Sequence, residues 1–246
     1  GGLANVADGH MTGISIGGLA NVADRGVTGI SFGGLANVGD GDVTGITVGG
    51  LANVAGENMT GISVGGLANV AGGELTGISV GGLAAVGEEG ITGITVGGLS
   101  VISEENIVGV QATIGGMDAG GDLVGINVGG IGMITRAAMP EMILLHTLHG
   151  IDIKVESEAV GLTAAGIDVR AGDVRGMAAA LAFVDADELH GFSASCVNNY
   201  TVYQRGLTIG VVNIAEDLEG IQLGLVNIVK SGKGWRRVLP IANWRF

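Results

Sequence analysis

One sixteen-residue stretch decides the fold of this chain: GGLANVADRGVTGISF, residues 17–32. It opens on two glycines, continues through a short apolar phrase with one asparagine, crosses an acidic turn and ends on Thr-Gly-Ile-Ser-Phe. Three or more glycines in each such unit, with β-branched residues between them, disfavour a helix. A sixteen-residue unit is also too short for a helical-hairpin repeat. We therefore interpret the unit as β-structure.

The same unit recurs along the chain. The phrase GGLANV begins at Gly1, Gly17, Gly33, Gly49 and Gly65. Variants of it begin at Gly81, Gly97, Gly115 and Gly129. In the second half the spacing shortens to 14–15 residues, and the asparagine phrase returns around Asn213 and Asn227. A fixed period of this kind is typical of a repeat architecture in which each unit packs on the next.

Each unit contains two candidate strands. Residues 12–16 alternate apolar side chains with Gly and Ser, which is the period of a strand. The glycine pair 17–18 permits a sharp corner, residues 19–22 form a second short strand and residues 23–26 form a turn. Two strands and two turns describe one coil of a β-solenoid. The sequence therefore predicts an all-β, elongated single-chain solenoid with coils of 14–16 residues and a core of Ile, Val, Leu and Ala.

Stacked coils would place identical residues on top of one another, about 4.8 Å apart. The asparagines of successive units would then form a ladder of amide-to-amide hydrogen bonds. The predicted ladder consists of Asn5, Asn21, Asn37, Asn53 and Asn69.

A transmembrane β-barrel is the alternative fold. Each unit would then be one strand of about 12 residues followed by a hairpin turn, which is long enough for a tilted span. The C-terminal Trp244-Arg245-Phe246 is compatible with this alternative. Three features count against a barrel: aromatic girdles are missing, the lipid face would carry Gly and Ala, and antiparallel strands would send identical asparagines to opposite rims.

The repeat pattern divides the chain into four parts. Residues 1–134 form a regular array, and residues 150–229 form a degenerate one. Between them, residues 135–149 lose the glycine period around Pro140, which predicts a helical or loop insertion. Residues 230–246 carry both tryptophans and a basic cluster, and we expect a C-terminal cap or anchor there, because a solenoid must cover its last strand edge.

The last part of the chain resembles a known family. The phrases GLTIGVVNIA (residues 206–215) and GIQLGLVNIV (residues 220–229), with the closing LPIANWRF (residues 239–246), are similar to bacterial surface repeat proteins first noticed in spirochaetes. The resemblance covers residues 206–246 well, residues 1–134 as a Gly-Gly-Leu-Ala-Asn variant, and residues 135–205 faintly. The family has no assigned activity, so the resemblance implies an envelope or surface location and little chemistry.

Charge and composition exclude several functional classes. The net charge of −13 leaves no basic stripe for nucleic acid. A single cysteine, Cys196, rules out an internal disulfide framework. The chain contains no uninterrupted run of about 18 apolar residues, so we expect no transmembrane helix. The chain begins in the middle of a repeat phrase at Gly1, so we interpret it as a processed or trimmed product.

Candidate chemistry is weak throughout, and we predict no catalytic, cofactor-binding or metal-binding residues. Stacked turn acids could hold calcium, but their spacing is irregular, which favours solvated carboxylates. The acids are Asp8, Asp24, Asp40, Asp42, Glu57, Glu74, Glu88, Glu89, Glu104, Glu105 and Asp122.

A second repeated feature is a set of threonines. Thr12, Thr28, Thr44, Thr60, Thr76 and Thr92 recur at the same spacing, each followed three residues later by Ser or Thr. A flat threonine array would suit ice binding, but residues three apart fall on opposite faces of a strand.

Histidines give no stronger signal. His146 and His149 are a weak metal pair without further ligands. His10, His190 and Cys196 occur singly and are expected to be structural or exposed. The sequence therefore predicts a non-enzymatic, cofactor-free structural or interaction module of the bacterial envelope, cell surface or outer membrane: a scaffold, spacer or adhesive surface. Its protein partner is unknown, nucleic acid is not expected, and residues 230–246 could associate with a membrane. The alternative is an outer-membrane barrel acting as a pore or anchor.

Overall fold

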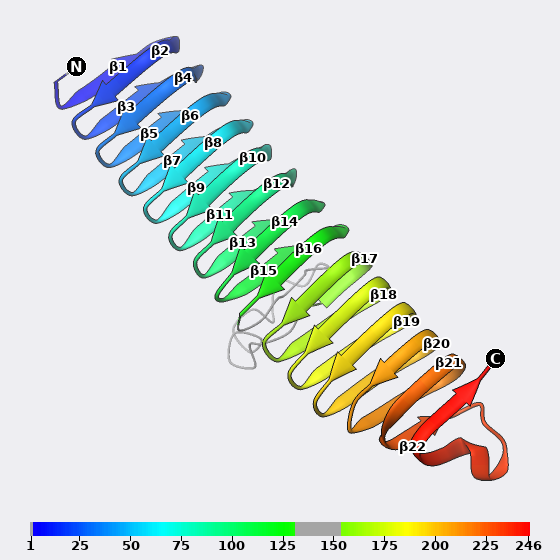
Figure 1. The fold of residues 1–246 in the computed structure, drawn as a ribbon. Coiled ribbons are helices and arrows are strands. Elements are labelled where there is room, and N and C mark those ends of the chain that lie inside the picture. The colour runs from blue at the N-terminus through cyan, green and yellow to red at the C-terminus, as the bar shows by residue number, and fades with distance from the viewer. Residues whose placement is uncertain (1, 131–153) are drawn as a thin grey trace, which may run out of the picture. The chain divides into compact units, whose positions relative to one another are not determined.

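The computed structural model describes residues 2–130 and 154–246, which are almost entirely β-structure (Figure 1). Within these ranges the helical structure is a single 3-10 turn, η1 (Gly234–Arg237). The prediction of an all-β fold is therefore confirmed. The insertion expected at residues 135–149 lies outside the described residues. The chain divides into two compact units, Gly1–Ile114 (unit 1) and Gly115–Phe246 (unit 2).

Unit 1 alternates short and long strands. The short strands are β1 (Ala4–Ala7), β3 (Ala20–Ala23), β5 (Ala36–Gly39), β7 (Ala52–Ala55), β9 (Ala68–Ala71), β11 (Ala84–Gly87) and β13 (Ser100–Ser103). The long strands are β2 (His10–Gly17), β4 (Gly26–Gly33), β6 (Val43–Gly49), β8 (Met59–Gly65), β10 (Glu74–Gly81), β12 (Gly90–Gly97) and β14 (Ile107–Thr113).

Strands of the same kind lie side by side and form two parallel sheets, as Figure 1 shows. Partners are sixteen residues apart, so that Asn21 pairs with Asn37 and Ile46 with Ile62. Parallel pairing of every second strand is the topology of a β-solenoid, as predicted. The barrel alternative is wrong, because it requires antiparallel pairing between strands that are consecutive in the chain.

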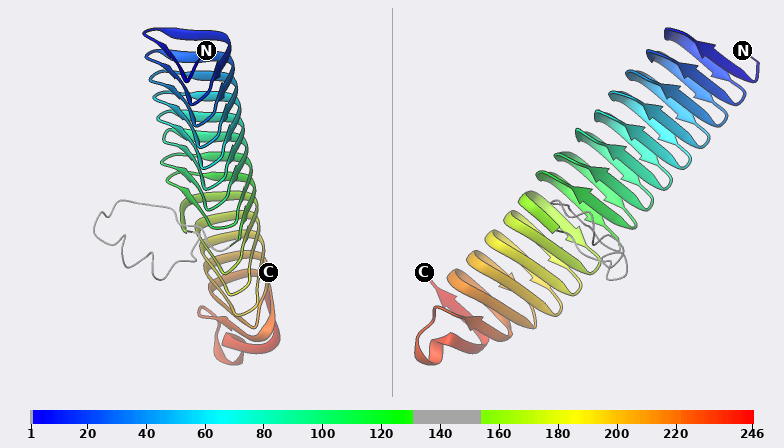
Figure 2. Two further views of the ribbon diagram at one scale, coloured as in Figure 1. Left: turned by 90° about the vertical axis from the view of Figure 1, so that its left-hand side faces the viewer. Right: turned by 180° about the vertical axis from the view of Figure 1, so that it is seen from behind.

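Three corners close each coil of unit 1. One is the Gly-Gly pair and another is the acidic turn. The third is a glycine inside each long strand: it is Gly13 in β2, with φ 96°, and in the later long strands φ lies between 110° and 126°, a region that favours glycine. The glycines of the later long strands are Gly29, Gly45, Gly61, Gly77, Gly93 and Gly109. The left view of Figure 2 shows the resulting closed outline of the individual coils.

The interior of unit 1 contains two polar columns beside one column of large apolar side chains. The apolar column consists of buried Val27, Val43, Met59, Leu75, Ile91 and Ile107. The second column consists of buried Ser31, Thr47, Ser63, Ser79 and Thr95. The third is the asparagine ladder. The expected core of Ile, Val, Leu and Ala is therefore only partly correct, because buried asparagines and buried Ser or Thr side chains occupy two of its columns.

The predicted asparagine ladder is confirmed. The Nδ2 atom of Asn37 donates to the Oδ1 atom of Asn53 at 2.8 Å, and Asn53 donates in the same way to Asn69. The amides of Asn21, Asn37, Asn53 and Asn69 also donate across the coil to a backbone carbonyl, as Asn37 does to Val48 at 2.8 Å. Asn37 and Asn53 are fully buried, so this pairing satisfies groups that would otherwise be costly to bury.

The first glycine of each Gly-Gly pair makes this ladder possible. A Cβ atom on Gly49 would overlap the carbonyl oxygen of Ala52 and would come within 2.8 Å of the Oδ1 atom of Asn53. Glycine at this corner therefore lets the chain pass close to the asparagine that the corner encloses.

Unit 2 consists of strands β15 (Gly116–Ala119), β16 (Leu123–Gly129), β17 (Lys154–Ala165), β18 (Asp168–Ala180), β19 (Phe183–Ser195), β20 (Asn198–Ile209), β21 (Val212–Val229) and β22 (Val238–Arg245). From β16 to β21 each strand pairs in parallel with the next one in order. The partners on β18 and β19 are fifteen residues apart, as in Val184 with Val169, and those on β20 and β21 are fourteen apart, as in Asn199 with Asn213.

In the shorter coils, one continuous strand replaces the separate short and long strands of unit 1. The 15-residue coil has two residues, Gly172 and Asp173, where unit 1 has three turn residues, and the 14-residue coil also loses one glycine of the Gly-Gly pair. A second asparagine ladder runs from Asn199 through Asn213 to Asn227, with 2.8 Å between amides. The last strand, β22, reverses direction and pairs antiparallel with β21.

Candidate interaction surface

The most distinctive surface of unit 1 is apolar. On each long strand, the residue after the bending glycine and the residue two further along point outward. The first column is Ile14, Ile30, Ile46, Ile62, Ile78, Ile94 and Val110, and the second is Ile16, Phe32, Val48, Val64, Val80, Val96 and Ala112. We call these two columns the Ile–Val face. Ile46, Ile62, Ile78 and Ile94 are 39–48% exposed, although isoleucine is among the residues most often buried.

The sequence analysis found the alternation of these strands but not its orientation. In β8 the hydroxyl-bearing Ser63 is buried, whereas Ile62 and Val64 on either side of it are exposed. The alternation therefore has inverted polarity, with the small polar residue inside and the large apolar residue outside.

A leucine ridge borders the Ile–Val face beyond the Gly-Gly corner. Leu19, Leu35, Leu51, Leu67 and Leu83 are each 44–45% exposed. The short strands that follow present half-buried Ala and Val, as in Ala52 and Val54 of β7. No charged residue occupies any of these outward positions in unit 1. An uncharged surface that continues over many coils is unusual for a protein with this net charge, and such patches mark interaction sites.

All the acids of unit 1 lie instead in the turns between each short strand and the following long strand, or, as Glu74 does, at the first residue of the long strand. They are Asp8, Asp24, Asp40, Asp42, Glu57, Glu74, Glu88, Glu89, Glu104 and Glu105. Side chains connect successive turns: the Oδ1 atom of Asp42 accepts from the backbone nitrogen and from the Nδ2 atom of Asn58, each at 3.1 Å. Asn58 in turn accepts from the backbone nitrogen of Glu74 at 2.9 Å. These polar side chains therefore satisfy turn amides.

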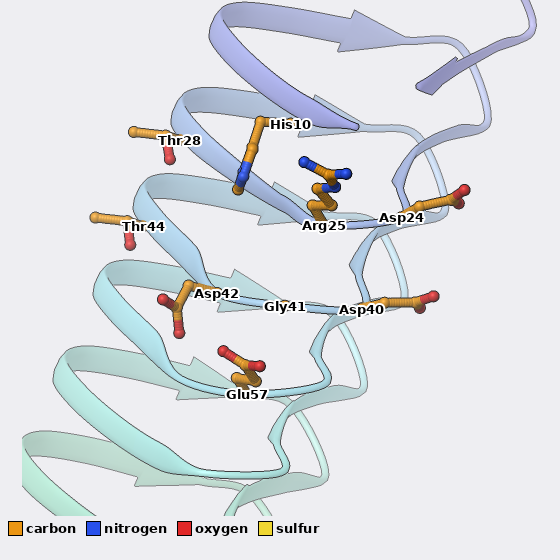
Figure 3. A pocket seen from close by; sticks show the side chains of 9 residues that line it. All are labelled: His10, Asp24, Arg25, Thr28, Asp40, Gly41, Asp42, Thr44 and Glu57. Carbon is orange, nitrogen blue, oxygen red and sulfur yellow. The ribbon is translucent and has the colours of Figure 1, made fainter. Parts of the chain in front are cut away.

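A shallow open depression of about 440 Å³ lies on this acidic edge (Figure 3). It is lined by His10, Asp24, Arg25, Thr28, Asp40, Gly41, Asp42, Thr44 and Glu57. In Figure 3 the side chains of Asp24 and Asp40 point to one side, and those of Thr28 and Thr44 to the other. The described residues contain no group of three or more His, Cys, Asp or Glu side chains that could hold a metal ion. Asp122, in unit 2, accepts from the backbone nitrogen of Glu158 at 3.2 Å.

The threonine column is placed as the sequence predicts. Thr28, Thr44 and Thr60 are exposed, while Ser31 and Thr47, each three residues after one of these threonines, are buried. The hydroxyls therefore form one outward column, not a double array on one face.

The isolated candidate residues are dispersed. His10 lines the acidic depression, His190 lies 3.4 Å from a carboxylate oxygen of Glu188, and Cys196 is exposed. His146 and His149 lie outside the described residues.

The basic residues of the C-terminal segment contact acids of unit 2. The Nζ atom of Lys230 lies 2.8 Å from a carboxylate oxygen of Glu216 and donates to the hydroxyl of Tyr200 at 3.4 Å. The hydroxyl of Tyr200 in turn donates to a carboxylate oxygen of Glu216 at 3.0 Å. The hydrogen bonds from Lys230 and Tyr200 lower the pKa of Glu216, and the bond to Glu216 raises the pKa of Lys230. Arg245 lies 3.6 Å from Asp217. Two of the basic groups at this end are thus partly neutralised by neighbouring carboxylates.

Apolar side chains also project from this segment. Ile241, Trp244 and Phe246 are all more than half exposed. Among the described residues, no helix is long and apolar enough to cross a membrane. Comparison with protein-family models, curated proteins and solved structures finds no match.

Proposed function

We propose that this chain is a non-enzymatic scaffold of the bacterial envelope, in which the Ile–Val face of unit 1 mediates association. The observation that carries the proposal is the exposure of two uncharged apolar columns over successive coils. Removal of such a surface from water is favourable by about 25 cal/mol for each Å² that is buried, so each coil adds a similar increment.

Repetition supports a binding role over a catalytic one. Each coil presents the same outward residues, so the surface offers many equivalent weak contacts at a regular spacing. Catalysis instead needs different groups that converge on one position. The envelope location rests on the resemblance of residues 206–246 to bacterial surface repeat proteins.

A pair of matched double variants tests the role of the face. Ile46→Lys with Ile62→Lys places two charges on the Ile–Val face of strands β6 and β8. Thr44→Lys with Thr60→Lys places the same two charges on the same strands, on the other side of the bending glycine. All four residues are exposed, so both variants should keep the fold, which circular dichroism can verify.

The measurement is the fraction of purified protein that sediments with bacterial envelope fragments. We expect the wild-type chain and the threonine variant to sediment with the fragments, and the isoleucine variant to remain in the supernatant. Equal sedimentation of both folded variants would show that the Ile–Val face is not the association surface. A wild-type chain that stays in solution would contradict the envelope role itself.

A further inference from the structure

The charge of the terminal segment, residues 230–246, differs from that of the remaining chain. The segment contains five of the eleven basic residues of the chain and none of its 24 acids. Each acid of the preceding strand β21 already lies near a base: Glu216 near Lys230, Asp217 near Arg245 and Glu219 near Arg205. Residues 233–237 add two arginines and a lysine, and the side chains of Lys233 and Arg237 are exposed. The acids of β21 therefore leave a local excess of positive charge.

Apolar side chains are exposed at the same end of unit 2. Val238, Ile241 and Trp244 of β22 are 51–76% exposed. Leu225 of β21 is 69% exposed and directly follows Gly224, the residue that pairs with Ile241. The turn η1 contacts both β21 and β22, and Figure 1 shows these elements together at the C-terminal end. Basic and apolar side chains thus share one end of unit 2.

The backbone of Ile241 is strained. Its φ is 70°, and among the described residues it is the one non-glycine residue with a positive φ. A β-branched side chain rarely occupies this left-handed region, which glycine or asparagine adopts at lower cost. Because Ile241 is 76% exposed, burial within its own chain does not offset this strain. Strained residues cluster at functional sites, and contact with a partner would explain why an isoleucine is held here.

We propose that residues 230–246 attach the chain to an anionic lipid surface. Lys233 and Arg237 approach the headgroup phosphates, which attract Lys and Arg near a membrane. Ile241 and Trp244 enter the boundary between headgroups and acyl chains, the depth at which tryptophan is enriched. Such a contact is reversible on its own, and stable anchoring takes a second one. The Ile–Val face supplies that second contact in the proposed function, so envelope fragments retain a dilute chain only while both surfaces are intact.

Tryptophan fluorescence can follow this attachment, because both tryptophans of the chain, Trp235 and Trp244, belong to the segment. The full chain is titrated with protein-free vesicles of equal parts phosphatidylglycerol and phosphatidylcholine, and separately with vesicles of phosphatidylcholine alone. We expect the emission to shift to shorter wavelength with the anionic vesicles only. Added salt should weaken this binding, because it screens the attraction between the bases and the headgroups.

A pair of charge variants tests the basic residues. Lys233→Gln with Arg237→Gln should weaken binding to the anionic vesicles about fivefold for each base, and about 25-fold together. Arg25→Gln with Arg175→Gln removes the same two charges from positions outside the segment. This control should change the affinity by less than about twofold, because salt screens charges that lie far from the membrane.

Ile241→Asn separates attachment from folding. Asparagine tolerates a positive φ, so the variant should be at least as stable as the wild-type chain in urea. Its binding to anionic vesicles should nevertheless weaken at least about fivefold, because the apolar side chain is lost. Leu181→Asn is the control: Leu181 is 64% exposed in the turn between β18 and β19, and its replacement should leave vesicle binding unchanged.

Other outcomes would overturn the inference. Equal binding to both kinds of vesicle, or equal losses in a variant and its control, would show that the segment does not recognise anionic lipid. A chain that binds polyphosphate but neither kind of vesicle would have a soluble polyanion as its partner. An Ile241→Asn protein that loses stability and binding together would show that Ile241 supports the fold. The vesicles contain no envelope protein, so none of these outcomes affects the comparison of the isoleucine and threonine variants with envelope fragments.

Discussion

The side-chain amide of Asn53 donates to the backbone carbonyl of Val64 at 2.9 Å, and so connects opposite sides of one coil. The same nitrogen donates to the Oδ1 atom of Asn69 in the next coil at 2.8 Å. One residue thus stabilises both the closure of its own coil and the stacking of the next.

Replacement of an interior ladder residue should therefore destabilise the protein. Asn37→Ala removes one donor from the Oδ1 atom of Asn53, one donor from the carbonyl of Val48 and one of the acceptors of Asn21. We expect a loss of about 1–3 kcal/mol in the free energy of unfolding, measured by urea denaturation. Asn58→Ala, which removes solvent-exposed hydrogen bonds at a turn, is the control and should lower it by no more than about 1 kcal/mol. Equal effects would show that the ladder contributes nothing beyond a surface hydrogen bond.

The glycine corner should be equally sensitive. Gly49→Ala introduces a Cβ atom that overlaps the carbonyl oxygen of Ala52, so the corner must move away from the ladder. We expect a destabilisation of about 1–3 kcal/mol, as for other overpacked sites. Gly9→Ala is the control, because its Cβ atom would have no neighbour within 4 Å. A Gly49→Ala protein as stable as the control would indicate that the corner tolerates a side chain.

Acid should weaken the attachment of the C-terminal segment. Hydrogen bonds from Lys230 and Tyr200 place the pKa of Glu216 below its ordinary value. A carboxylate with a depressed folded pKa contributes stability above its unfolded pKa, about 4.3 for Glu, and that contribution is lost as the pH falls through the folded value.

Amide hydrogen exchange of β22 can measure this effect. Between about pH 5 and pH 3, protection of β22, corrected for the intrinsic exchange rate, should fall more in the wild-type chain than in Glu216→Gln, which lacks the titrating group. The same pH profile in both proteins would contradict the assignment.

Removal of the last strand should expose a sheet edge. Deletion of residues 231–246 removes β22, whose backbone pairs with β21 from Gly220 to Ile228. An uncovered parallel edge can accept a strand from another molecule, so we expect aggregation or filament growth, visible by light scattering and electron microscopy. Deletion of Phe246 alone leaves β22 in place and should have no such effect. A truncated chain that stays monomeric and equally stable would show that β22 does not protect the edge.

The sequence predicted the stacking because the units are nearly identical. Asn21, Asn37 and Asn53 can form one column only if the coils are in register, and the sixteen-residue period leaves one register in which all the repeated residues match. The direction of the side chains was harder to predict. Alternation around Ser63 defines two faces but does not tell which face is inside, and general hydrophobicity favours burial of Ile62 over Ser63. The asparagine ladder decides the matter, because its amides need small polar neighbours, as where Asn69 donates to the Oγ atom of Ser79.

Two features of unit 2 also escaped the sequence analysis. Asn199 continues the ladder although it does not follow the Gly-Gly-Leu phrase, and only its pairing with Asn213 reveals its position. The antiparallel direction of β22 has no local signal either. Pro240 indicates only that this segment cannot donate a hydrogen bond at that residue.

The sixteen-residue register has a consequence for the gene. Because a coil in the middle of unit 1 contacts neighbours that nearly copy it, unequal recombination between two repeats would delete or duplicate a whole coil and join identical surfaces at the new junction. The inherited length of the array can therefore change in steps of one coil, whereas an insertion of a single residue would displace every asparagine on one side of it from its partner.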